Sequence, residues 1–139
     1  SVNISEKKGE QKHPVPEILL KLHHGILGDA HAGDWHRQIS LLAEESVDGM
    51  RAVCSIPLTS GVFAENINTK GLDLKSLPLG THLRVGPAEL EVTQIGKECH
   101  SDCAIKQAAG RCVMPTDGIF AVVIKEGTVR AGDEIEVIA

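Results

Sequence analysis

Three of the four cysteines lie close together in the second half of the chain. Cys99, Cys103 and Cys112 fall within fourteen residues, and His100 lies among them. A cysteine thiolate attacks sulfur, carries sulfur or binds soft metal ions. No other stretch of the chain gathers side chains with this chemistry so densely, so this cysteine window is the first place to look for function.

The spacing within the window indicates how the thiols are activated. Cys99 and Cys103 are four residues apart, so a helical turn between them would place both sulfurs on one face. The N-terminal end of a helix favours the thiolate. Lys97 and Arg111 add positive charge nearby, while acidic neighbours oppose it. We predict that Cys99, Cys103 and Cys112 are catalytic. The alternative is three buried thiols that act as small apolar side chains.

The same window supports a metal site as a second interpretation. Its four candidate ligands are Cys99, His100, Cys103 and Cys112. These are ligand types that zinc and iron–sulfur clusters use. Common zinc sites pair cysteines as C-x2-C or C-x4-C, whereas here three residues separate the first pair. Zinc or an iron–sulfur cluster therefore stays a structural alternative to thiol reactivity.

Two upstream segments offer polar groups for an anionic ligand. Residues 23–38 are rich in glycine, histidine and aspartate, and His31, His36 and Arg37 supply hydrogen-bond donors. Glycines leave backbone amides accessible to an anion, and arginine binds phosphate with two parallel bonds. Farther along, Glu65 and Asn66 stand in an apolar stretch. The alternatives are a solvated turn for the first segment and backbone capping for the second.

Length and composition limit the classes of protein to consider. A chain of 139 residues suffices for one domain, and we expect an N-terminal arm over residues 1–15, flexible and polar, followed by a single domain over 16–139. The net charge of −5 argues against a nucleic-acid partner. No apolar run approaches the length of a membrane span, and the first residues do not resemble a signal peptide. We expect a cytoplasmic protein with reduced thiols and no membrane partner.

Frequent turn signals separate short apolar or alternating runs, which is typical of a mainly β fold. The clearest alternation is residues 88–93, where apolar and polar side chains take turns. We expect further strands at residues 18–22, 39–42, 83–85, 120–124 and 135–137. Helical spacing predicts short helices at 43–54 and 102–109. In the first, Cys54 shares a face with Val47 and Met50, so we expect it to be inert.

These motifs, in this order, resemble the MOSC domain, named after the C-terminal region of molybdenum cofactor sulfurases. The resemblance covers about residues 18–138. It is carried by Gly-Ile-Leu-Gly-Asp-Ala-His-Ala-Gly at 25–33, Arg-Gln-Ile-Ser-Leu-Leu at 37–42, Phe-Ala-Glu-Asn-Ile at 63–67, Leu-Gly-Thr-His-Leu-Arg-Val-Gly at 79–86, Leu-Glu-Val-Thr-Gln-Ile-Gly-Lys-Glu-Cys at 90–99 and Gly-Thr-Val-Arg-Ala-Gly-Asp at 127–133.

The resemblance implies a β-barrel-like fold with a few short helices and a sulfur-carrying cysteine at Cys99. It implies a sulfur carrier or transferase in molybdenum cofactor or metal–sulfur cluster metabolism, with a cysteine desulfurase or a cofactor biosynthesis or acceptor protein as partner. Pyridoxal phosphate would belong to the desulfurase. The alternative is a non-catalytic module that binds molybdopterin or molybdenum. We expect the cofactor-binding residues to be His31, His36, Arg37, Glu65, Asn66, Lys97 and Arg111.

Overall fold

The chain forms a mainly β fold, as predicted, in a computed structural model that describes residues 1–5, 12–30, 32–35, 37–51, 65–96 and 118–138. The strands are β1 (Val2–Ile4), β2 (His13–Val15), β3 (Glu17–Lys21), β4 (Gly25–Ile26), β5 (Ile39–Ala43), β6 (Ile67–Thr69), β7 (His82–Val85), β8 (Ala88–Ile95), β9 (Ile119–Lys125), β10 (Gly127–Arg130) and β11 (Ile135–Val137). The helices are α1 (Glu44–Arg51) and a short 3-10 helix, η1 (Leu74–Ser76).

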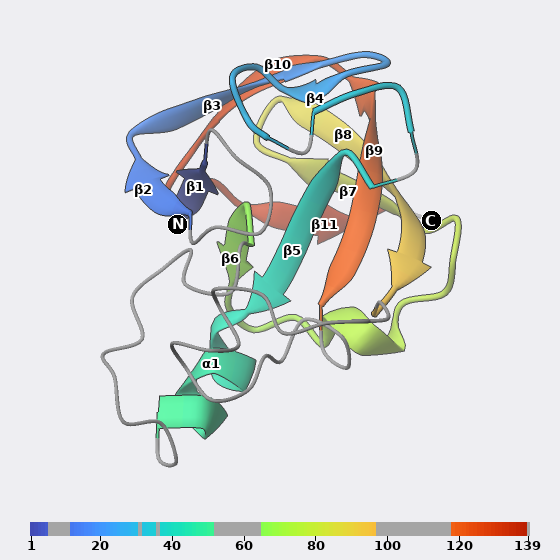
Figure 1. The fold of residues 1–139 in the computed structure, drawn as a ribbon. Coiled ribbons are helices and arrows are strands. Elements are labelled where there is room, and N and C mark those ends of the chain that lie inside the picture. Colours follow the sequence, from blue (N-terminus) through green and yellow to red (C-terminus); the bar gives the residue numbers. More distant parts are fainter. Residues whose placement is uncertain (6–11, 31, 36, 52–64, 97–117, 139) are drawn as a thin grey trace, which may run out of the picture.

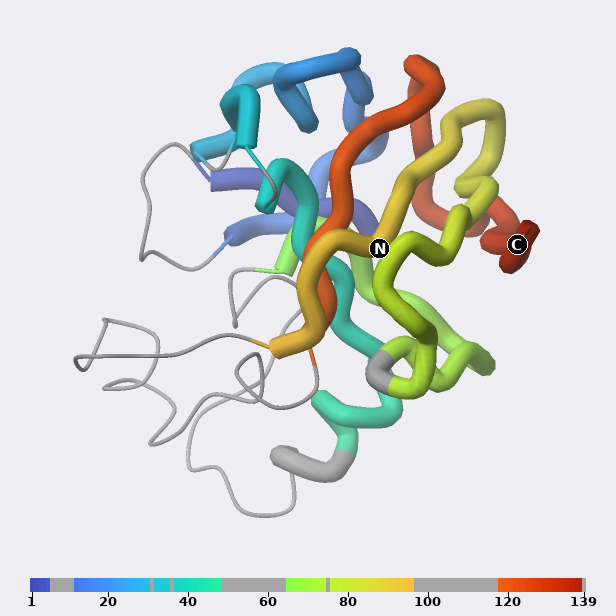
Figure 2. Tube along the Cα trace, turned by 90° about the vertical axis from the view of Figure 1, so that its right-hand side faces the viewer, coloured from blue at the N-terminus to red at the C-terminus, as the bar shows by residue number. Residues whose placement is uncertain are grey.

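Two sheets make up this fold. Eight strands form one sheet in the order β11-β7-β8-β9-β5-β6-β1-β2, and β10-β3-β4 form a second sheet of three. The three-stranded sheet lies across one end of the larger sheet, and α1 lies at the opposite end (Figures 1 and 2). Among the described residues the large sheet keeps two edges, β11 and β2. The mainly β prediction is thus confirmed, whereas closure of the sheet into a barrel is not observed.

The strand periodicity in the sequence corresponds to the observed burial. In β8, buried residues alternate with partly exposed ones from Ala88 to Thr93. All five residues of β5 are buried, which fits a central strand covered on both faces. The other expected strands are also found, each within two residues of its predicted limits. Hydrophobic alternation was therefore a sound guide to these elements.

Helix α1 begins directly after β5. Glu44 and Glu45 occupy its first turn, where negative charge interacts favourably with the helix dipole. Val47 is buried, as the predicted apolar face requires. The helix is confirmed over Glu44–Arg51. The last part of the predicted range, with Cys54, lies outside the described residues, and so does the expected helix at 102–109.

The N-terminal segment contributes to the large sheet. We expected a flexible arm over residues 1–15, and within it β1 pairs with both β2 and β6. Val2 and Asn3 are buried. The division into an arm and a domain stays a prediction, but the described parts of the arm pack as strands and add apolar area to the core.

The core lies between the two sheets. Its residues come from both sheets and are almost entirely buried: Val2, Ile18, Leu20, Ile26, Ile39, Leu41, Ala43, Ile67, Leu74, Leu83, Val85, Ala88, Leu90, Val92, Ile119, Ala121, Val123 and Val129. On β5 and β9 the alternate residues Ser40, Leu42 and Phe120 are buried but stand outside this cluster. Successive side chains of a strand point to opposite faces, so these three belong to the second face of the large sheet.

Candidate functional site

The cysteine window lies outside the described residues, but both of its attachment points are described. The amide of Gly96, just after β8, donates to the carbonyl of Gly118, just before β9, over 2.7 Å. One step inside the sheet, Ile95 pairs with Ile119. The segment 97–117, with Cys99, Cys103 and Cys112, therefore starts and ends at one point of the large sheet.

Arg37 lies close to that point. Its guanidinium carbon is 5.7 Å from the centre of the Phe120 ring, and Phe120 is two residues beyond Gly118. The same carbon is 4.9 Å from the centre of the Trp35 ring. A cation near an aromatic face gains about 0.5–2 kcal/mol. Two aromatic rings thus orient the guanidinium on the second face of the sheet.

The hydrogen bonding of Arg37 is incomplete. Its Nε is buried and has no hydrogen-bond partner within the described part of the chain. A buried donor that makes no bond costs about 1–3 kcal/mol, and more when it carries charge. The residue as a whole is partly exposed. An acceptor oxygen from an anionic ligand would satisfy this donor.

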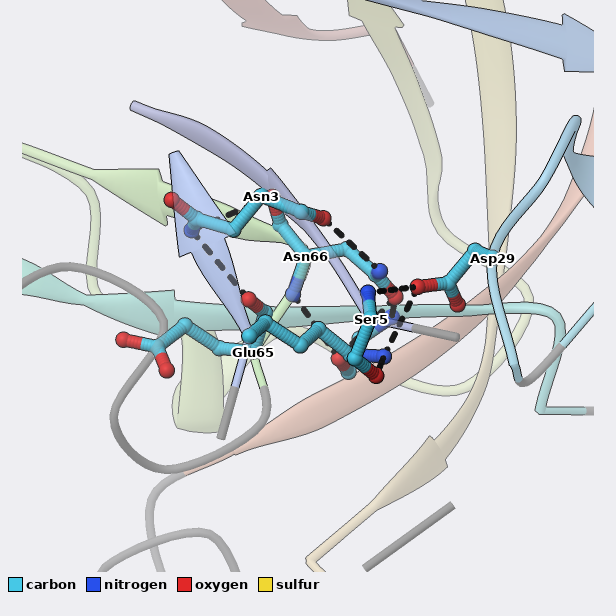
Figure 3. A network of polar contacts seen from close by, with 7 residues as sticks. Asn3, Ser5, Asp29, Glu65 and Asn66 are labelled. Carbon is cyan, nitrogen blue, oxygen red and sulfur yellow. Dashed lines mark hydrogen bonds and ion pairs between the residues drawn. The ribbon is translucent and has the colours of Figure 1, made fainter. Parts of the chain in front are cut away.

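Asn66 is linked to Phe120 through Ser40 of the neighbouring strand β5. Ser40 of β5 pairs with Phe120, and Asn66 bonds to Ser40. The Asn66 Oδ1 accepts from the amide of Ser40 at 2.9 Å and from its hydroxyl at 3.2 Å. On its other side, Nδ2 of Asn66 donates to the carbonyl of Asn3 at 3.2 Å (Figure 3). Both ends of the buried amide are therefore engaged by the protein, which favours a structural role.

Glu65 is fully buried and lies beside Asn66 (Figure 3). One of its carboxylate oxygens accepts from Nδ2 of Asn68 at 2.7 Å. Its backbone carbonyl accepts from Nδ2 of Asn3 at 3.2 Å. The backbone capping that we considered as the alternative for residues 65–66 is thus seen for Asn66, whereas the carboxylate of Glu65 bonds to a side-chain amide. Cofactor binding by either residue stays a prediction.

The glycine-rich segment is held by close backbone packing and by a buried ion pair. Gly25 has φ of 108°, and a Cβ there would come within 3.0 Å of Gln38, so only glycine fits. Farther along, Asp29 accepts from Nζ of Lys12 at 2.8 Å, and neither side chain is exposed. The amide of Ser5 donates to the same carboxylate oxygen at 3.1 Å (Figure 3). Three separate segments therefore meet at Asp29.

The structure describes only some of the predicted site residues. Arg37 contacts Phe120 of β9, and Phe120 pairs with Ser40 of β5. Ser40 in turn bonds to Asn66, which directly precedes β6. The predicted residues outside the described part are His31, His36, Lys97, Cys99, His100, Cys103, Arg111 and Cys112. Within the described part, no group of three histidine, cysteine, aspartate or glutamate side chains has the arrangement of a metal site.

Several residues of this region were not predicted from the sequence. Trp35 and Phe120 flank Arg37, and Lys12 and Ser5 bind Asp29. Two aromatics in a chain that has only three were a usable signal. Lys12 gave no signal, because a lysine in a polar stretch is almost always solvated.

A groove of about 490 Å³ lies elsewhere on the molecule. It is lined by residues 68–72 on one side and 132–135 on the other, with Ser1 and Glu44. Its lining does not include Arg37, Glu65 or Asn66. Among the described residues no helix is long and apolar enough to cross a membrane.

Comparisons with known proteins agree with this geometry. A family model described as "MOSC domain" matches residues 28–136. The fold is similar to that of the YuaD protein of Bacillus subtilis, with 21% identity, a TM-score of 0.76 and coverage of 96% of this chain and 91% of that one. It also resembles YiiM of Geobacillus stearothermophilus, with 20% identity, a TM-score of 0.75 and coverage of 100% and 73%.

YiiM of Escherichia coli is a more distant match in shape, with 20% identity, a TM-score of 0.66 and coverage of 99% of this chain and 68% of that one. At these identities the likeness concerns the fold alone. No curated protein matches the chain significantly. The family model thus carries the assignment of the family, and the solved structures support the fold.

Proposed function

Because the chain belongs to the MOSC domain family, which is related to the molybdenum cofactor sulfurases, we propose that it carries sulfur on Cys99. The recipient would be the molybdenum cofactor or a metal–sulfur centre. One observation supports this proposal most directly. Arg37, oriented by Trp35 and Phe120, contacts a residue two positions from Gly118, where the cysteine segment joins the sheet. This supports the proposal that an anion receptor and the thiols act together.

The proposed chemistry needs no added oxidant. The Cys99 thiolate attacks the outer sulfur of a persulfide on a donor protein. The new bond joins Cys99 Sγ to that sulfur, the donor's sulfur–sulfur bond breaks, and the donor leaves as a thiolate. The donor is a cysteine desulfurase, whose pyridoxal phosphate forms the first persulfide. The Cys103 or Cys112 thiolate then attacks Cys99 Sγ, so that a disulfide forms, the persulfide bond breaks and the outer sulfur leaves as hydrosulfide for the acceptor. A dithiol reductant afterwards reduces the disulfide to the two thiols.

The described residues fit the phosphate of a pterin cofactor better than they fit its metal. Arg37 offers a buried Nε with no hydrogen-bond partner in the described part of the chain, on a residue that is partly exposed as a whole. Guanidinium is the side-chain group best matched to phosphate oxygens. Arg37 would therefore hold the phosphate, and the bound cofactor would supply the metal as the sulfur acceptor. Lys97, Arg111, His31 and His36 stay the further predicted donors.

The test of this proposal uses Cys99→Ala, with Cys54→Ala as its matched control. Each purified protein is incubated with a cysteine desulfurase and cysteine, and its intact mass is measured. The wild type and Cys54→Ala should gain about 32 Da for each sulfur, and dithiothreitol should remove it. Cys99→Ala should gain none. Equal sulfur uptake by Cys99→Ala would contradict the assignment of the carrier cysteine.

A binding module without thiol chemistry is the second candidate function. The Nε of Arg37, which has no hydrogen-bond partner among the described residues, favours it, because anion binding requires no reactive cysteine. A wild-type protein that binds molybdopterin but gains no sulfur would support this candidate. Elemental analysis of protein purified without chelator completes the comparison. Stoichiometric zinc or iron, lost in Cys103→Ser, would instead support the structural metal site.

A further inference from the structure

The ion pair between Lys12 and Asp29 joins the N-terminal segment to the glycine-rich loop. Lys12 Nζ lies 2.8 Å from Asp29 Oδ1 and 3.0 Å from the hydroxyl of Ser5. Neither side chain of the pair is exposed. Lys12 also stands outside the range matched by the family model, which starts at residue 28. The common domain pattern therefore does not account for this lysine.

The bonds around Asp29 fix the start of the loop that leads to Arg37. The carbonyl of Ser5 accepts from the amide of Ala30 at 2.8 Å. The carbonyl of Asp29 accepts from the amide of Ala32 at 3.1 Å. Both bonds depend on where the Asp29 segment lies, and the carboxylate of Asp29 is what ties that segment to Ser5 and Lys12. The first half of the loop is thus held by backbone bonds together with the carboxylate of Asp29, which adds the tie to Lys12.

The second half of the loop contains Trp35, whose ring contacts the guanidinium of Arg37. The amide of Gly33 donates to the carbonyl of His24 at 2.6 Å, and the amide of Trp35 donates to the carbonyl of Gly33 at 3.0 Å. Trp35 then stacks on Arg37. Arg37 itself is followed by Gln38 and β5, both buried. The strand fixes the backbone next to Arg37, whereas the backbone of Trp35 belongs to the loop and bonds to Gly33 within it.

We propose that Lys12, through Asp29, is a positioning residue that holds Trp35 against Arg37 and so sets the affinity of Arg37 for an oxyanion. A buried carboxylate that loses its cationic partner rearranges or draws in water. The loop would then shift, and Trp35 would no longer confine the guanidinium. This inference rests on the oxyanion-binding part of the proposed function and not on the chemistry of Cys99.

Trp35 is the only tryptophan in the chain, so its fluorescence reports the loop directly. The test compares the wild type with Lys12→Met, which keeps the length of the side chain and removes its charge. Quenching by acrylamide measures the exposure of Trp35, and titration with inorganic phosphate measures the affinity. Both are recorded at a temperature where circular dichroism shows each protein to be folded. We expect a clear increase in quenching and an affinity for phosphate about fivefold weaker.

Two further variants separate positioning from stability. Val85→Ala removes buried atoms from β7, far along the chain from the loop, and should lower the melting temperature without changing quenching or affinity. The double variant Lys12→Met with Asp29→Asn buries no unpaired charge and remains folded if Lys12→Met alone does not. It should regain melting temperature but keep the altered quenching and the weaker affinity, because the tie from Lys12 is absent.

The proposal is overturned if quenching and phosphate affinity in Lys12→Met, or in the double variant where the single one unfolds, stay within twofold of the wild type. It is also overturned if Val85→Ala changes both to the same extent, or if the wild type binds no phosphate. These outcomes are independent of sulfur uptake. A Cys99→Ala protein that still takes up sulfur refutes the carrier function and leaves the result for Lys12 unchanged.

Discussion

Arg37 is the residue whose surroundings say most about ligand chemistry. Its guanidinium is stacked on two rings, yet its Nε makes no hydrogen bond within the described part of the chain. We expect Arg37→Lys to weaken the binding of inorganic phosphate about tenfold, because lysine keeps the charge but loses the planar fork and the stacking. Isothermal titration calorimetry measures this change. Unchanged affinity would leave Arg37 with a purely structural role.

Asn66 illustrates the opposite case, a polar residue that the protein itself satisfies. Replacing it by alanine leaves the Ser40 amide and the Asn3 carbonyl without this partner in a buried environment. We expect Asn66→Ala to reduce the free energy of unfolding by about 2–5 kcal/mol. Urea denaturation measures it. Ser76→Ala, which removes an exposed bond to Asp73, is the control and should cost at most about 0.5 kcal/mol.

The two roles proposed for Asn66 differ in a second measurement. If Asn66 is structural, phosphate affinity of the folded variant stays near that of the wild type. A variant of normal stability that no longer binds phosphate would instead establish Asn66 as a ligand-binding residue. The sequence alone could not separate these roles, because the sequence pattern around a buried asparagine does not show whether the side chain bonds to the backbone or to a cofactor.

At the scale of elements, a row of alternating charges crosses four strands of the large sheet. Glu136 of β11 faces Arg84 of β7, which faces Glu89 of β8, which faces Lys125 of β9. The bond from Arg84 to Glu136 is 2.9 Å long, but both side chains are more than half exposed. Such pairs contribute little, because water and salt screen them. The buried face of the same strands should carry most of the stability.

Neighbouring residues of β7 test this difference between faces. Arg84→Met should reduce the free energy of unfolding by less than about 1 kcal/mol. Leu83→Ala should reduce it by about 2–5 kcal/mol, because Leu83 is fully buried in the core. Chemical denaturation of the two variants gives the comparison. Similar losses in both would mean that the row of charges is more than a solvated surface.

The sequence predicted the strands with clear periodicity and missed those without it. Alternation identified β8, and the buried run at 39–42 identified β5. The strands β1, β2, β4, β6 and β10 were not predicted, because two to four residues rarely show a clear period, although the equally short β11 was identified. The irregular pairing of β8 with β9 between Val92 and Gln94 also gave no signal. It depends on the partner strand, as does the parallel pairing of β5 with β6.

The sequence indicated the chemical type of one candidate site residue, the donor Arg37, but not the residues that position it. Arg37 was identified because arginine among glycines and histidines is an unusual donor group. Its neighbours Trp35 and Phe120 come from segments more than eighty residues apart, and only the pairing of β5 with β9 brings them together. Lys12 was hidden for a similar reason. Its burial depends on a partner, Asp29, that local sequence does not reveal.

At the scale of the whole molecule, the range matched by the family model is shorter than the unit that packs together. The match covers residues 28–136 and leaves out β1 to β4. Those strands supply Val2, Ile18, Leu20 and Ile26 to the core, all at most 3% exposed. β3 is also a neighbour of β10 in the three-stranded sheet. We infer that the segment before residue 28 is part of the folding unit.

A fragment of residues 28–136 should therefore fail to fold stably. Each of the four lost core side chains, Val2 included, contributes about 1.5–3 kcal/mol on burial, so their sum approaches the whole stability of a small domain. Asp29 would in addition lose its buried cationic partner, Lys12. Circular dichroism during heating should show a cooperative transition for the full chain and none for the fragment. A fragment that melted cooperatively within a few degrees of the full chain would mean that β1 to β4 only decorate a core complete without them.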